Sequence, residues 1–195
     1  MGRPRTFDRV KVLHDAVEVF RDRGYDATSV PDLVDRLGIC RQSLYSEFGD
    51  KRGLYLEALE HWGRKEIDAK VALLAAPGSP LENVRTVVRG WANYATACPS
   101  DGCLTTKAII ESRGDADALA VVEGQVASLE EGFRDTLERA REIGELRPDI
   151  HPERLARMLL VSAHGIGVLS RLPLSGPRVA DAVSTLLALL DDAAV

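Results

Sequence analysis

Apolar residues recur every three or four positions along most of the chain, and this spacing places them on one face of an α-helix. In the first such segment, Asp8 to Arg23, the apolar positions are Val10, Leu13, Val17 and Phe20. Further segments with the same spacing follow at 54–74, 81–98, 115–143, 153–171 and 179–190. Runs rich in β-branched residues are few, so the pattern predicts an all-α fold.

Two short helical segments joined by a tight turn lie between Ser29 and Lys51. Gly38 is expected to end the first segment, because glycine adopts the left-handed conformation at little cost. The second segment begins near Cys40 or Arg41. Leu44 and Phe48 form its buried side, and the outward positions are Gln42, Ser43 and Ser46. This order is typical of a helix-turn-helix, whose second helix can enter the major groove of DNA.

About the first third of the chain resembles the DNA-binding domain of TetR-type transcriptional repressors. The residues that carry the resemblance are Phe20, Gly24, Tyr25, Thr28, Ser29, Leu37, Gly38, Ile39, Ser43, Leu44, Tyr45, Phe48 and Lys51. The resemblance implies an N-terminal three-helix helix-turn-helix domain over residues 1–50 and a C-terminal helical domain for effector binding and dimerisation over residues 51–195. The chain departs from the family at Cys40, because Ser, Thr or Asn usually precedes the recognition helix and a thiol is a poor cap.

Predicted DNA contacts come from the N-terminal arm, the helix-turn-helix and the start of the next helix. Arginine pairs with guanine and glutamine with adenine, so Arg41 and Gln42 are the predicted base readers. Lys51 follows the predicted cap Asp50 and is expected to bind a phosphate. The arm fits either a phosphate contact or a solvated terminus, and Glu47 is expected to be solvated. The full predicted set is Arg3, Arg5, Ser29, Arg41, Gln42, Ser43, Tyr45, Ser46 and Lys51.

The overall charge does not favour nucleic acid. The net charge of the chain is −5, and residues 1–60 hold ten basic and eleven acidic side chains. DNA binding therefore depends on where individual charges lie rather than on bulk charge. Contacts of this kind are expected to weaken steeply as the salt concentration rises.

The C-terminal part offers candidates for an effector pocket. Trp91, Tyr94 and Cys98 share one face of the predicted helix 81–98, where they fit either the core or the wall of a pocket. His164 fits either a core histidine or a pocket residue. The effector is expected to be small and largely apolar. The predicted pocket set is Trp62, Trp91, Tyr94, Cys98, Cys103, Phe133 and His164.

Three cysteines without a signal peptide suggest a reducing cytosol, so a cytoplasmic location is expected. Cys98 and Cys103 flank a turn, where they fit either a reversible redox switch or two buried apolar residues. The stretch Gly102-Cys103-Leu104 resembles a motif of some TetR-type repressors in which the cysteine lies near the effector. The histidines are scattered, so no metal site and no cofactor are expected. The apolar stretch 155–170 is too short to span a bilayer, and no membrane partner is expected.

Together these features predict a homodimeric DNA-binding repressor that leaves a palindromic double-stranded operator when an effector binds. The helices at 153–171 and 179–190 are the expected dimer interface, and the helix from Leu54 is the expected moving element. One alternative is a thiol-based redox sensor that uses Cys98 and Cys103. A second is an adaptor whose helix-turn-helix no longer reads DNA. A small helical enzyme is disfavoured, because the sequence has no Ser-His-Asp set, glycine-rich phosphate loop or suggestive carboxylate pair.

Overall fold

The computed structural model describes residues 7–97, 103–172 and 174–195, without the side chains of 94–97. Over these ranges the chain forms helices and no strand, apart from an isolated bridge between Leu146 and Ala194. The all-α prediction is confirmed. The helices are α1 (Arg9–Arg23), α2 (Val30–Leu37), α3 (Arg41–Phe48), α4 (Lys51–Trp62), η1 (Gly63–Ile67), α5 (Asp68–Leu74), α6 (Pro80–Ala97), α7 (Leu104–Glu111), α8 (Ala116–Glu142), α9 (Pro152–Leu169) and α10 (Gly176–Asp192).

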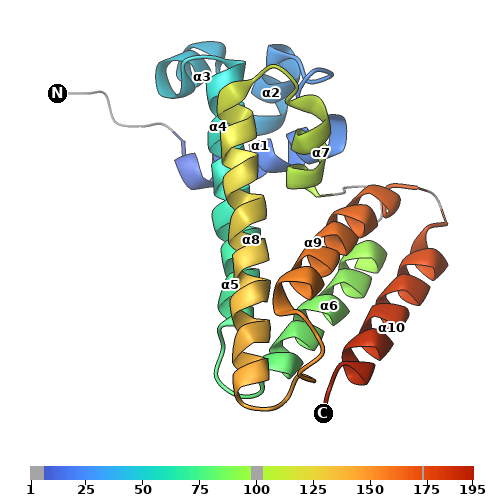
Figure 1. Ribbon diagram of the computed structural model, residues 1–195. Helices are drawn as coiled ribbons and strands as arrows, with labels where there is room; N and C mark the ends of the chain where they lie inside the picture. The colour runs from blue at the N-terminus through green and yellow to red at the C-terminus, as the bar shows by residue number, and fades with distance from the viewer. Residues whose placement is uncertain (1–6, 98–102, 173) are drawn as a thin grey trace.

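The helices are arranged along one long central pair (Figure 1). The continuous segment α4–η1–α5 runs beside α8, and the short helices α1, α2, α3 and α7 gather around one end of this pair. Helices α6, α9 and α10 pack beside the other end, with α6 in contact with α8, α9 and α10. The helix-turn-helix therefore lies at one end of a rod whose other end belongs to the C-terminal helices.

Side-chain caps fix where the N-terminal helices begin. Asp8 accepts hydrogen bonds from the first backbone N–H groups of α1. Ser29 and Asp32 form a reciprocal capping box at the start of α2, and Gly38 ends that helix in the left-handed conformation with φ of 64°. Cys40 makes no side-chain cap on α3, as expected for a thiol. The left-handed conformation of Gly38 therefore turns the chain between α2 and α3.

The long helix predicted over 54–74 is present as the continuous segment α4–η1–α5, in which Gly63–Ile67 forms a π-helical turn. Gln125 of α8 packs against this turn. Its Nε2 donates to the Leu59 carbonyl at 2.8 Å, and a Cβ at Gly63 would lie 2.6 Å from the same nitrogen. A side chain at position 63 would therefore displace Gln125, and π-turns of this kind are common at functional sites.

Two apolar clusters form the core. One joins α1–α4 to α7 and the start of α8, and its fully buried members include Phe20, Leu33 and Leu44. The other joins η1, α5, α6, α8, α9 and α10 around Phe133. Because α4, α7 and α8 contribute to the first cluster, apolar packing crosses the boundary predicted at residue 50. A two-domain division at that residue remains a prediction.

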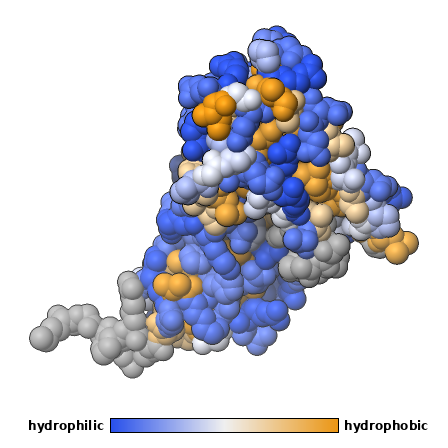
Figure 2. Space-filling view, turned by 90° about the horizontal axis from the view of Figure 1, so that it is seen from below, coloured by the Kyte–Doolittle hydropathy of each residue, from blue (hydrophilic) through white to orange (hydrophobic). Residues whose placement is uncertain are grey.

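Part of the apolar surface is exposed, and Figure 2 shows it as patches between larger hydrophilic areas. On α9 and α10 the exposed large apolar residues are Met158, Val161, Val168, Leu169 and Leu189. Val161 is 70% exposed in the single chain. Among the helices described here, none is both long and apolar enough to cross a membrane.

Candidate nucleic-acid interface and effector cavity

Helix α3 has an apolar inner face and a polar outer face. Leu44 and Phe48 are buried against the rest of the N-terminal core. Arg41 and Gln42, in the first turn, are exposed, and Tyr45 is 47% exposed. Ser46 is exposed and donates its hydroxyl to the Ser43 carbonyl, while Ser43 is half-buried. The structure thus brings five predicted DNA-contacting side chains together on one short helix.

Arg9 fixes how α3 sits on its neighbours. Its Nε donates to Glu47 of α3 at 2.8 Å, its Nη2 pairs with Glu57 of α4, and its guanidinium lies 5.4 Å from the centre of the Phe48 ring. The expectation that Glu47 is solvated is wrong, because its side chain is only 16% exposed and takes part in this ion pair. The two ion pairs of Arg9 orient α3, the predicted recognition helix, relative to α1 and α4.

The thiol at the start of α3 has an unusual environment for an exposed cysteine. Cys40 Sγ lies 3.2 Å from Ser43 Oγ. The hydrogen bond from Ser43, together with the backbone N–H groups of the first turn, lowers the pKa of the Cys40 thiol. Cys40 lies at the same end of the recognition helix as Arg41 and Gln42.

The other predicted phosphate contacts are placed differently. The Ser29 hydroxyl is engaged with Asp32 inside the capping box. Lys51 donates from Nζ to the carbonyls of Tyr25 and Thr28, both at 3.0 Å, and its nitrogen lies 4.0 Å from the centre of the Tyr25 ring. A phosphate at Lys51 would have to share or replace these bonds. Arg3 and Arg5 lie outside the described residues.

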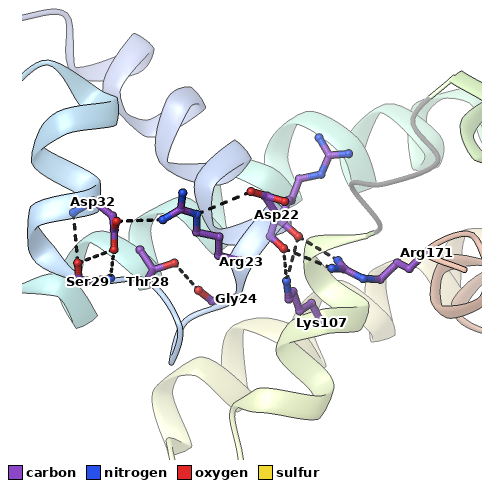
Figure 3. Close-up of polar contacts among 9 residues, drawn as sticks. Asp22, Arg23, Gly24, Thr28, Ser29, Asp32, Lys107 and Arg171 are labelled. Carbon is purple, nitrogen blue, oxygen red and sulfur yellow. Dashed lines mark hydrogen bonds and ion pairs between the residues drawn. The ribbon is translucent and has the colours of Figure 1, made fainter. Parts of the chain in front are cut away.

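The C-terminal end of α1 is held by cations from the other half of the chain (Figure 3). Lys107 of α7 donates to the carbonyls of Arg21 and Asp22 at 3.1 and 2.9 Å. Arg171, just after α9, donates to the same two carbonyls at 3.0 and 3.3 Å. Positive charge is favourable at a helix C-terminus. Burial, and then the charge of Arg171, lower the pKa of Lys107.

Two further contacts join the helix-turn-helix region to the rest of the chain. The backbone N–H of Tyr25 donates to Glu111 of α7 at 2.8 Å. Arg52 of α4 donates two hydrogen bonds to Asp115, each 2.8 Å long, and this interaction lowers the pKa of Asp115 to about 2. These contacts could not be predicted from the sequence, because they join residues more than 60 positions apart whose individual types are common on helix surfaces.

A cavity of about 380 Å³ lies between η1, α5, α6, α8 and α9. Four residues of the predicted pocket set line it: Trp62, Trp91, Cys103 and His164. Phe133 is fully buried behind the wall, with its ring centre 6.1 Å from that of Trp91. The Tyr94 side chain and Cys98 lie outside the described residues. The lining residues that sequence reasoning assigned to the core or did not consider include Ile67, Leu73, Val87, Leu129 and Ile166.

Buried hydrogen bonds connect the cavity wall to α7 and α8. Trp62 donates from Nε1 to Thr105 Oγ1 at 3.1 Å, and Thr105 donates to Gln125 Oε1 at 2.6 Å. Thr106 Oγ1 lies 3.0 Å from His164 Nδ1. Burial lowers the pKa of His164, because a buried site disfavours the protonated imidazole. Helix α7 therefore contacts the lining residues Trp62 and His164 through Thr105 and Thr106 in its first turn. The same helix contacts α1 through Lys107.

Two family models match the chain. The model described as "Bacterial regulatory proteins, tetR family" matches residues 12–58, which contain the helix-turn-helix. The model described as "Tetracyclin repressor-like, C-terminal domain" matches residues 80–186, which contain most of the cavity-forming helices. The two matches thus cover both halves of the fold.

The similar proteins are also transcriptional regulators. The chain is 35% identical to the uncharacterized HTH-type transcriptional regulator YezE of Bacillus subtilis (strain 168), with 98% of this chain and 100% of YezE covered. It is also 43% identical to the HTH-type transcriptional repressor ComR of Escherichia coli (strain K12) over 61 residues. These residues make up 31% of this chain and 29% of ComR. A solved complex of the TetR family regulator CifR with 26-base-pair operator DNA has a TM-score of 0.76 and 28% identity over 93% of this chain and 98% of that chain.

Proposed function

The chain belongs to the TetR family of bacterial transcriptional regulators, and from that premise we propose that it is a homodimeric repressor released from a palindromic operator by a small, largely apolar effector. The proposal that the chain binds DNA rests on one observation, the polar outer face of α3. Arg41, Gln42, Tyr45 and Ser46 are exposed there, while Leu44 and Phe48 hold the helix to its scaffold. The similarity to CifR, which is solved with operator DNA, supports DNA binding by this chain.

The side chains divide by chemistry into base readers and phosphate contacts. Arg41 and Gln42 can each make two hydrogen bonds to a base edge in the major groove. Tyr45, Ser43, Ser46 and Ser29 are short or carry a hydroxyl, which suits phosphate contacts that position the protein. Lys51, Arg3 and Arg5 are proposed as further phosphate contacts, and Lys51 would give up part of its internal hydrogen bonding to make one.

The exposed apolar faces of α9 and α10 support dimerisation through these helices. Val161, Val168 and Leu189 lie on helices that already pack within the chain, yet their side chains are 70%, 45% and 48% exposed. Pairing with a second copy would remove this apolar surface from water, and four helices would then meet at the interface. A two-fold dimer presents two copies of α3, which predicts an operator with inverted half-sites roughly 34 Å apart.

The cavity and α7 supply a route from effector to DNA. Trp62 and Cys103 line the cavity, and Lys107 on α7 holds the end of α1. The π-turn η1 lies within α4–η1–α5, the element proposed to move. An effector changes DNA affinity only by binding one conformation better than the other, and the coupling is typically about 1–3 kcal/mol.

A thiol-based switch remains a second candidate. It requires Cys98 to approach Cys103, and Cys98 lies outside the described residues. Cys103 lines the cavity, so its oxidation or alkylation would act at the same place as an effector. Loss of a response to oxidant in Cys103→Ser, with DNA binding intact, would favour this mechanism.

Selection from a random double-stranded DNA pool with the full chain tests the proposed function. The expected result is enrichment of one inverted repeat, bound by two chains. Enrichment of a single half-site without symmetry would overturn the dimeric repressor, and failure to enrich any sequence at low salt would overturn sequence-specific binding.

A further inference from the structure

The cavity between η1, α5, α6, α8 and α9 has a buried inner end and an exposed rim. Its volume of about 380 Å³ is larger than the roughly 150 Å³ that holds benzene in a protein core, and it leaves room for two fused rings with one small substituent. The exposed lining residues, which form the rim, include Lys65, Ala69, Leu73, Thr86 and Gly90. A ligand in the cavity therefore has one end enclosed by the protein and the other end near water.

The inner end of the cavity is apolar. Its buried aliphatic lining residues include Val87, Leu129 and Ile166. Trp62 uses its polar atom elsewhere, because its Nε1 donates to Thr105 Oγ1 at 3.1 Å. His164 Nδ1 lies 3.0 Å from Thr106 Oγ1, and its Nε2 is buried. The part of a ligand that enters here finds no polar partner in these two rings, so it must be apolar.

The rim of the cavity carries positive charge. The charged lining residues are two lysines and one glutamate, Lys65, Lys70 and Glu66. Lys70 is occupied by Glu66, because its Nζ donates to the Glu66 carboxylate at 3.2 Å and to the Glu66 carbonyl at 2.9 Å. Lys65 is exposed and forms no ion pair with the residues that the structure describes. Its ammonium is therefore available to a ligand at the rim.

An anionic group fits this rim better than a cationic or neutral one. The ammonium of a lysine carries three donors on a flexible four-carbon stem, so Lys65 can turn toward a carboxylate. A carboxylate at the rim also keeps part of its hydration, which avoids the cost of burying a charge. A cationic group at the same place would be repelled, and a neutral group would gain no charge attraction.

We propose that the cavity binds an amphipathic monocarboxylate, with its apolar body in the inner end and its carboxylate at the rim beside Lys65. The proposal rests on the proposed function, because it names the chemical class of the effector for the same cavity. The apolar body supplies most of the affinity by burial, and the ion pair with Lys65 sets the preferred charge of the ligand.

Three probes with the same rings test the preferred charge on the full chain. 2-Naphthoate is anionic, 2-naphthamide has nearly the same shape without the charge, and 2-naphthylmethylammonium is cationic. Isothermal titration calorimetry measures their affinities in about 0.15 M salt. The carboxylate is expected to bind about 2- to 5-fold more tightly than the amide, which is the ratio expected from one exposed ion pair. The ammonium probe should bind most weakly.

Two charge variants show whether Lys65 is the partner of the carboxylate. Lys65→Met removes the charge and keeps an unbranched side chain, so 2-naphthoate and 2-naphthamide should then bind alike. Arg64→Met is the matched control, because Arg64 precedes Lys65 in η1, is paired with Glu60 and does not line the cavity. It removes the same charge but should keep the preference of the parent chain, because salt screens charges that do not touch the ligand.

A pair of glycine variants shows where the probes bind. Gly90 lines the cavity and has open space beside it, so Gly90→Leu should block all three probes without crowding the helix. Gly124 also has open space but does not line this cavity, so Gly124→Leu should bind the probes as the parent chain does. Circular dichroism checks that all four variants remain folded.

Each part of the proposal has a result that would overturn it. Binding of 2-naphthamide or of the ammonium probe at least as tightly as 2-naphthoate would overturn the anionic class. A preference for 2-naphthoate that persists in Lys65→Met, or falls equally in Arg64→Met, would overturn the assignment of Lys65. Failure of all three probes to bind the parent chain, or unchanged binding in Gly90→Leu, would overturn the site.

Binding of the selected operator is measured with and without 2-naphthoate, and this separates the proposal from the proposed function. Weaker operator binding in the presence of the probe is the expected result. An operator complex that is unaffected by bound 2-naphthoate would overturn the effector role. Absence of any operator complex, with the calorimetric results as expected, would overturn the proposed function itself and leave the ligand class standing.

Discussion

The guanidinium of Arg21 lies 4.9 Å from the centre of the Trp62 ring. The last turn of α1 therefore rests on a residue that lines the cavity, and the contact is a buried cation–π interaction because Arg21 is 6% exposed. The indole N–H of Trp62 is bound to Thr105 of α7. A ligand that displaces this indole would disturb α1 and α7 together. Helix α1 packs against α2 of the helix-turn-helix.

Removing the cations that hold the end of α1 should have a non-additive effect. Lys107 and Arg171 donate to the same two carbonyls, so each can compensate for loss of the other. We expect Lys107→Met and Arg171→Met each to lower the free energy of unfolding by about 0.5 kcal/mol. The double variant should lose about 1 kcal/mol more than the two single losses combined. Urea unfolding measures all three, and strictly additive losses would contradict the shared role.

Replacing the thiol at the start of α3 should stabilise the chain. Serine is among the best N-cap residues, and Cys40 makes no side-chain cap. Cys40→Ser is expected to raise the Tm by about 2 °C in a thermal scan. Cys40→Ala provides the matched control, because alanine cannot cap either. An equal rise in the alanine variant would show that removal of the thiol, rather than capping, is responsible.

The Arg52–Asp115 interaction should make the fold sensitive to acid. The hydrogen bonds from Arg52 lower the pKa of Asp115 to about 2, below its ordinary value of 3.8. A carboxyl with a lower pKa in the folded chain stabilises the fold above its unfolded pKa, and this contribution is lost as the pH falls from about 4 to about 2. We expect Asp115→Asn, which keeps an N-cap residue on α8, to show a weaker loss of stability over that range.

Urea midpoints between pH 2 and 5 measure this loss. Asp117→Asn is the control, because it removes only the exposed ion pair that Asp117 makes with Arg52 at 2.6 Å and leaves both bonds between Arg52 and Asp115 in place. Parallel curves for the parent chain and Asp115→Asn would contradict the assignment.

A charge on the exposed face of α9 should prevent dimerisation. Val161 is 70% exposed in the single chain, so Val161→Glu is tolerated in the monomer but would bury an unpaired carboxylate at the proposed interface. Light scattering should give twice the chain mass of 21.2 kDa for the parent chain and the single-chain mass for the variant. Ile143→Glu, at an exposed site beyond the end of α8, should remain dimeric. A dimeric Val161→Glu would place the interface elsewhere.

The helices and the recognition face could be predicted because they depend on local signals. Apolar spacing locates the helices, and Ser29, Gly38 and Asp50 mark their ends through side-chain caps and backbone conformation. The packing of Gln125 against Gly63 could not be predicted, since it joins two helices that are far apart in the sequence. The internal bonds of Lys51 were missed for the same reason, because they depend on where distant carbonyls lie.

The cavity was only partly foreseen. Tryptophan and histidine could be predicted as pocket residues because both residue types are rare in this chain. Ile67, Leu129 and Ile166 have the same helical spacing as core residues, and spacing alone does not distinguish a packed core from the wall of a cavity. The distinction depends on how far apart the helices sit, which is a property of the assembled fold.

The central claim, that α3 reads a specific operator, is tested most directly by fluorescence anisotropy with the selected DNA site and a scrambled site across a salt series. We expect the parent chain to prefer its site at least 100-fold, with affinity falling steeply as salt rises. Arg41→Ala and Gln42→Ala should each weaken binding to the site about tenfold or more and reduce the preference, whereas Arg64→Ala, far from α3, should not. Equal affinity for both DNAs, or retention of the preference in the double variant Arg41→Ala/Gln42→Ala, would contradict the account.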